Sequence, residues 1–122
     1  MPFALLMTDI LKRREASKPR ARGFACNLDA IGSADRPRYV ELVKRVRASI
    51  RFRSPISTGY IFRLDSQTVS LPEAAEWIAM ERRCCPFLTL ELSTSGAQPD
   101  WTLTLTGPKG VKALLDLEFP QP

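Results

Sequence analysis

Three cysteines, Cys26, Cys84 and Cys85, are the residues of this chain best suited to chemistry. Thiolates bind soft ions such as Cu(I), and also zinc. The chain contains no histidine, which excludes a Cys–His catalytic pair and a four-ligand Cys/His zinc site within one chain. We therefore consider the three cysteines as candidate ligands of a soft metal ion or metalloid. The alternative is that they fill the core, since free cysteine is among the most buried residue types.

Cys84 and Cys85 are adjacent and directly precede Pro86. A trans peptide holds neighbouring Cα atoms about 3.8 Å apart, which is too close for an ordinary disulfide. Proline disfavours helical backbone at the residue before it. We therefore predict that Cys84 ends a helix, that Cys85 leads into the next strand, and that the two do not form a resting disulfide. Whether Cys26 joins them depends on which element lies beside the end of this helix.

Glu81 comes three and four residues before the two cysteines and is predicted on a neighbouring part of the helix surface. This spacing makes it a candidate ligand or general base, although a solvated charge is the simpler interpretation.

A thiol-dependent redox enzyme is a further alternative for the cysteines. Low-pKa cysteines favour helix N-termini, whereas Cys84 and Cys85 are predicted at a C-terminus, where the helix dipole opposes a thiolate. Arg82 and Arg83 would offset that effect in part, but the chain has no Cys-x-x-Cys motif. The sequence leaves open whether the protein is an enzyme, an ion-binding protein or a non-catalytic interaction module with cysteines in its core.

Helices are predicted around these residues from capping and periodicity. Ser70, with Pro72 and Glu73 after it, forms a capping-box pattern that begins a helix ending at Cys84. Another helix follows Ser33 or Asp35, either of which could cap it, with Pro37 in the first turn. Its apolar stripe is Tyr39, Leu42, Val43, Val46 and Ile50. A last helix after the segment 106–110 carries Val111, Leu114, Leu115 and Leu117 on its apolar face.

Five segments have the composition or alternation of strands, namely 24–31, 50–53, 60–64, 87–95 and 101–106. Residues 55–59 are predicted to connect two of them by a loop of more than two residues, and residues 96–100 by a turn. Strands joined by short links favour an antiparallel sheet. The sequence therefore predicts an α+β fold: a mostly antiparallel sheet of about five strands, two to three helices packed on it, and a short N-terminal helical arm.

The length of 122 residues predicts one domain. Residues 1–22 are interpreted as an N-terminal arm and basic linker, and residues 23–122 as the α+β domain. The arm holds six of the eighteen basic residues and only two of the thirteen acidic ones, so the domain is almost neutral. Because its folded body has an excess of only one positive charge, we consider nucleic-acid binding unlikely.

The apolar face of the arm consists of Phe3, Leu6, Met7, Ile10 and Leu11. A helix this short needs a surface to pack against. A second copy of the chain could provide that surface, so the arm is a candidate for forming a homo-oligomer. No segment has the ~18 apolar residues of a membrane span, and the N-terminal pattern does not resemble a secretory signal. An odd number of cysteines suits a reducing compartment, so the expected location is cytoplasmic.

The segment Glu81-Arg82-Arg83-Cys84-Cys85-Pro86-Phe87, together with residues 106–112, resembles a family of small bacterial proteins without an assigned activity. The family is marked by a Cys-Cys-Pro-Phe motif and a later Thr-Gly-Pro-x-Gly helix start. The similarity covers about residues 24–118, and the arm lies outside it. It implies handling of a soft metal or metalloid, with Cys26, Cys84 and Cys85 at the matching positions.

Overall fold

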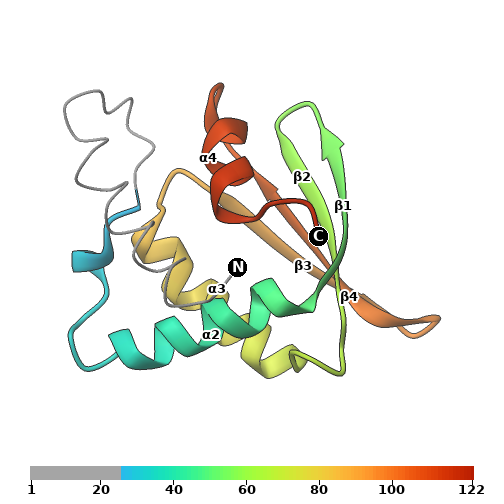
Figure 1. The fold of residues 1–122 in the computed structure, drawn as a ribbon, viewed down its shortest axis with the longest axis horizontal. Coiled ribbons are helices and arrows are strands. Elements are labelled where there is room, and N and C mark those ends of the chain that lie inside the picture. The colour runs from blue at the N-terminus through green and yellow to red at the C-terminus, as the bar shows by residue number, and fades with distance from the viewer. Residues whose placement is uncertain (1–25) are drawn as a thin grey trace.

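The computed structural model describes residues 26–122, and Figure 1 shows their arrangement. The arm helix, the basic linker and the predicted start of the domain at residue 23 lie outside the described residues. The described part contains three α-helices and a four-stranded sheet. In chain order the elements are η2 (Leu28–Ala30, a 3-10 helix), α2 (Arg36–Ser49), β1 (Ile50–Ile56), β2 (Gly59–Leu64), α3 (Leu71–Cys84), β3 (Thr89–Ser95), β4 (Gln98–Thr106) and α4 (Val111–Glu118).

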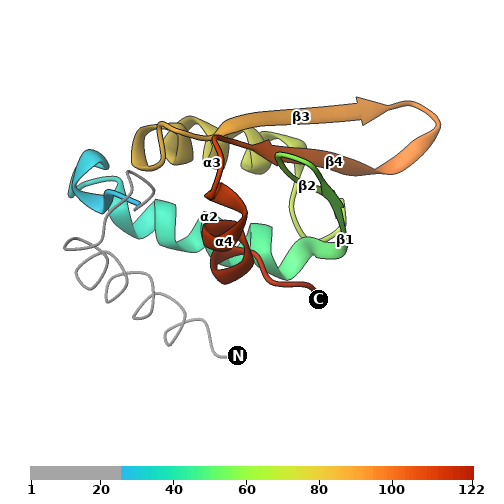
Figure 2. The same ribbon diagram turned by 90° about the horizontal axis from the view of Figure 1, so that it is seen from above.

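The sheet is antiparallel throughout, with the strand order β1-β2-β4-β3. Phe62 of β2 lies opposite Leu103 of β4, and Leu103 lies opposite Leu92 of β3. Phe62 and Leu103 are buried. The helices cover this face of the sheet, and the β3–β4 hairpin extends beyond them at one end (Figure 2). The core therefore lies between one face of the sheet and the helical layer.

The boundaries of α3 agree with the sequence prediction because the helix has strong signals at both ends. The Ser70 side chain accepts a hydrogen bond from the Glu73 N–H, and the Glu73 side chain accepts one from the Ser70 N–H, which completes the capping box. Cys84 is the last helical residue. The cysteine pair is thus positioned at the end of a helix whose register is fixed at its start.

Four members of the apolar stripe predicted for α2 are confirmed, since Tyr39, Leu42, Val43 and Val46 are all buried. The fifth, Ile50, is buried too but is the first residue of β1. Asp35 occupies the N-cap position, but its side chain makes no capping hydrogen bond. Ion pairs hold α2 against α3: Arg38 Nη2 lies 2.8 Å from Glu76 Oε1, and Arg45 Nη1 lies 2.9 Å from Glu73 Oε2.

The prediction of about five strands was wrong by one strand. Within the segment predicted as strand 24–31, residues 28–30 form the 3-10 helix η2. The Asn27 side chain accepts a hydrogen bond from the Asp29 N–H, and the Ile31 N–H donates to the Leu28 carbonyl. These local bonds turn the backbone instead of leaving it available to a neighbouring strand.

The β1–β2 hairpin is tighter than predicted. The strands continue to Ile56 and from Gly59, so only Ser57 and Thr58 separate them. Pro55 lies within β1, which is tolerated because β1 is an edge strand. Gly59 is required by close packing, since a Cβ atom there would lie 1.8 Å from the Leu105 carbonyl oxygen.

The buried face of α4 differs from the prediction at its end. Val111, Leu114 and Leu115 are buried as expected, but Leu117 is 56% exposed and Glu118 is buried instead. None of the helices in the described residues combines the length and apolar character needed to cross a membrane.

Candidate metal centre

The segment containing Cys26 lies against the C-terminal end of α3. The Asn27 N–H donates a 2.9 Å hydrogen bond to the carbonyl of Cys84, and Arg83 Nη2 donates to the Ala30 carbonyl at 3.1 Å. These bonds join segments almost sixty residues apart in the sequence. They place Cys26 beside Cys84 and Cys85, a proximity that the sequence could not establish.

The sulfur atoms of Cys26, Cys84 and Cys85 all lie within 4.8 Å of one another. The closest pair is Cys26 Sγ and Cys85 Sγ, at 2.6 Å. All three are free cysteines and all three are buried, with exposed fractions of 6%, 0% and 1%. The arrangement is therefore a thiol cluster that is closed to solvent rather than a surface site.

The backbone at Cys85 allows two adjacent cysteines to contribute to one cluster. Its φ of −127° and ψ of 72° are not helical, as predicted for a residue before proline. The Cys85 N–H still makes the last helical hydrogen bond, to the Glu81 carbonyl at 2.7 Å. On a continuous helix, neighbouring side chains diverge by about 100°. The exit from the helix at Cys85 removes that constraint.

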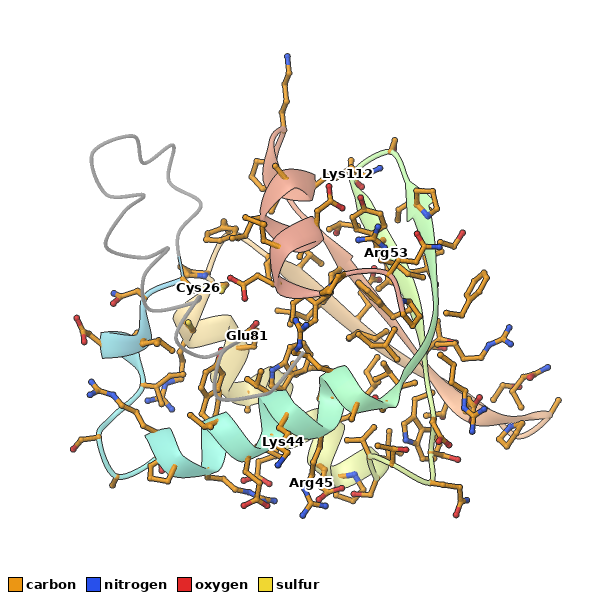
Figure 3. The ribbon with its side chains drawn as sticks, in the orientation of Figure 1. Cys26, Lys44, Arg45, Arg53, Glu81 and Lys112 are labelled. Carbon is orange, nitrogen blue, oxygen red and sulfur yellow. The ribbon has the colours of Figure 1, made fainter. Side chains whose placement is uncertain are left out.

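Glu81 is buried beside the cluster, with only 3% of its surface exposed, so its interpretation as a solvated charge was wrong. The Tyr39 hydroxyl of α2 donates a 2.6 Å hydrogen bond to Glu81 Oε1 and lies 4.0 Å from Cys84 Sγ. In Figure 3, Cys26 and Glu81 are close together at the C-terminal end of α3. Burial, with a further contribution from Cys84, raises the pKa of Glu81 to about 8.

Glu118 and Tyr39 are two polar members of this region that the sequence analysis did not identify as site residues. Glu118 is buried near the end of α4, and its Oε1 lies 3.7 Å from Cys26 Sγ. A signal for Glu118 was present, because it follows Val111, Leu114 and Leu115 at helical spacing and so belongs to the same face. Tyr39 was placed correctly on the apolar stripe, but nothing in the pattern indicates where its hydroxyl points.

The thiols affect one another's protonation. Hydrogen bonds from Cys26 and Cys85, assisted by the Tyr39 hydroxyl, lower the pKa of Cys84. The hydrogen bond between Cys26 and Cys84 raises the pKa of Cys26, and the one between Cys85 and Cys26 raises the pKa of Cys85. Cys84 is therefore the thiol of the cluster that loses its proton first, because hydrogen bonds from Cys26 and Cys85 stabilise its thiolate. A thiolate is the form of cysteine that binds a metal ion.

In comparisons with known proteins, no family model, no curated protein and no solved structure matches this chain. The case for a function therefore depends on the residues and geometry described above.

Proposed function

We propose that this protein binds a soft metal ion or metalloid through Cys26, Cys84 and Cys85. The observation that carries the proposal is the convergence of all three sulfur atoms within 4.8 Å from two segments distant in the sequence. Core filling alone does not require three thiols to lie within 4.8 Å of one another. Sulfur ligands are those that soft ions prefer.

The size of the cluster suits an ion after a small adjustment. Metal–sulfur bonds of about 2.3 Å place three sulfurs around one ion roughly 3.5–4 Å apart. Cys26 Sγ and Cys85 Sγ, now 2.6 Å apart, would have to separate by about 1 Å. A change of χ1 at Cys26, which lies outside the helices, can provide this movement without moving α3.

A thiol-dependent redox enzyme is the competing proposal, and the lowered pKa of Cys84 is the observation in its favour. A catalytic thiol must reach its substrate, however, and reactive cysteines are usually partly exposed. Cys84 and Cys85 are 0% and 1% exposed. A site closed to solvent is better suited to holding a bound ion than to a catalytic cysteine, which must meet a new substrate in each cycle.

The test is ligand-linked stability of the full chain, kept reduced with a phosphine. Cd(II) and arsenite would be titrated separately while the free energy of unfolding is measured. A ligand that binds the folded state alone, at a thousand times its Kd, should add about 4 kcal/mol. We expect this gain in the wild type with at least one of the two ligands, and its loss in Cys26→Ala and Cys84→Ala.

The control is Glu91→Gln, a substitution at an exposed position of β3. This variant should gain as much stability from the ligand as the wild type does. If neither ligand stabilises the wild type, or if the alanine variants gain as much as the wild type, the cysteines are core filler and the proposal fails.

A further inference from the structure

The ligand set that the fold assembles consists of sulfur alone. Among residues 26–122, the three cysteine sulfurs are the one group of three or more His, Cys, Asp or Glu ligand atoms that all lie within 4.8 Å of one another. Glu118 Oε1 lies 3.7 Å from Cys26 Sγ, yet no carboxylate oxygen belongs to this mutually close set. The site therefore offers three like ligands, whereas Zn²⁺ and similar divalent ions in closed sites take four in a tetrahedron.

Charge also distinguishes the possible ligands. A divalent ion bound to three thiolates forms a centre with one net negative charge. That charge would be buried beside the carboxyl groups of Glu81 and Glu118, both of which are less than 10% exposed. Burying this additional net charge in the core, next to groups that can themselves become negative, is costly. A trivalent centre bound to three thiolates is neutral and avoids this cost.

We propose, building on the ion-binding function above, that the ligand is a trivalent metalloid of the arsenite or antimonite class. It is held as a three-coordinate complex by Cys26, Cys84 and Cys85. Three As–S bonds form and three As–O bonds break when As(OH)₃ meets three thiols. Each thiol proton leaves with a hydroxide as water, so three waters are released. No electrons are transferred, and the lone pair on arsenic occupies the position where a fourth ligand would otherwise bind.

This mode of binding predicts a defined change in mass and a defined coordination shell. Native mass spectrometry of the reduced full chain with arsenite should show one adduct, heavier by one arsenic and lighter by three hydrogens. X-ray absorption at the arsenic edge should show three sulfur neighbours and no oxygen neighbour. Cys26→Ser should leave two sulfurs and one oxygen and weaken arsenite binding by at least tenfold, whereas Glu91→Gln should behave as the wild type.

A parallel titration with Cd(II) separates this inference from the function on which it rests. Arsenite bound by all three sulfurs, and more tightly than Cd(II), supports the metalloid assignment. Tight Cd(II) binding that needs the three cysteines, with arsenite bound weakly or through two sulfurs, overturns the assignment and leaves the ion-binding function standing. If neither ligand binds, both proposals fail.

Discussion

Two polar clusters lie on different sides of α4 and differ in how their charged and acidic groups are paired. The thiol cluster contains Cys26, Cys84 and Cys85 with Tyr39, Glu81 and Glu118 beside them. The second, which we call the arginine–tyrosine cluster, contains Arg53, Tyr60, Lys112 and Asp116. Asp116 and Glu118 are two positions apart on α4, which turns their side chains about 200° from each other. One short helix therefore contributes an acid to each cluster.

In the arginine–tyrosine cluster, opposite charges are paired in a partly exposed region, with Arg53 14% and Asp116 51% exposed; Figure 3 labels Arg53 and Lys112 of this cluster. Arg53 Nη1 donates to Asp116 Oδ1 at 3.0 Å and to the Phe119 carbonyl at 3.2 Å. The Arg53 guanidinium lies 4.1 Å from the centre of the Tyr60 ring, whose hydroxyl also donates to Asp116. These contacts attach α4 to β1 and β2, and that structural role explains them fully.

The thiol cluster follows no such pattern. Hydrogen bonds within it connect thiols, a phenol and two carboxyl groups, all of which become negative when they lose a proton. Grouping acids in the core raises the free energy of their charged forms. The two clusters therefore differ in their electrostatics, and perturbed ionisable groups gathered at one point mark the thiol cluster as a candidate functional site.

The largest expected effect that distinguishes the clusters is the pH dependence contributed by Glu81. Its pKa is about 8 in the folded protein and near 4.5 in the unfolded chain, so the folded state holds a proton that the unfolded state has lost. Its contribution to stability is complete below pH 4.5 and is lost as the pH rises to 8. The loss is at most about 1.4 kcal/mol per pH unit.

Glu81→Gln removes this titration. In the metal-free protein, the variant should therefore gain stability relative to the wild type as the pH rises from 4.5 to 8, as measured by urea unfolding at several pH values. Glu76→Gln on the same helix, where the Arg38 guanidinium lowers the pKa of the carboxyl group, should show no gain over this range. A constant difference between Glu81→Gln and the wild type would contradict the buried, protonated state of Glu81.

An intermediate effect is expected from removing the hydroxyl of one tyrosine in each cluster. Tyr39→Phe takes away the donor that Glu81 Oε1 uses in the core, and a buried acceptor without its partner costs about 1–3 kcal/mol. Tyr60→Phe removes a donor from Asp116, which is 51% exposed and retains Arg53, so a loss below about 1 kcal/mol is expected. If urea unfolding shows the same loss of stability in both variants, the two clusters do not differ in the energy of their tyrosine hydrogen bonds.

The sequence predicted best those elements that are determined by local signals. The capping box at Ser70 and the proline after Cys85 fixed both ends of α3, and the alternating leucines identified β3 and β4. These signals act over a few residues, so they can be recognised without knowledge of the fold. The 3-10 helix at residues 28–30 was missed because a short apolar run with turn-forming residues also fits a strand.

The sequence identified several residues of the candidate site, but it did not show that they lie together in the fold. The cysteines were identified by type, and Glu81 by its spacing from them. The meeting of Cys26 with Cys84 and Cys85 is supported by hydrogen bonds from Asn27 to Cys84 and from Arg83 to Ala30, neither of which has a local signal. Glu118 joins the site because the buried face of α4 lies next to Cys26, which is likewise a property of the whole fold.

The smallest expected effect is the coupling between Arg53 and Asp116. Arg53 is 14% exposed and Asp116 is 51% exposed, so solvent screens much of their attraction. A double-mutant cycle with Arg53→Ala and Asp116→Ala should give a coupling energy of about 0.2–1 kcal/mol in urea unfolding. The value should fall as salt is added, because the pair is held by screened charges. A coupling energy well above this range that is insensitive to salt would mean that Arg53 and Asp116 act as a buried pair. The two clusters would then differ in the signs of the charges they group, and not in their exposure to solvent.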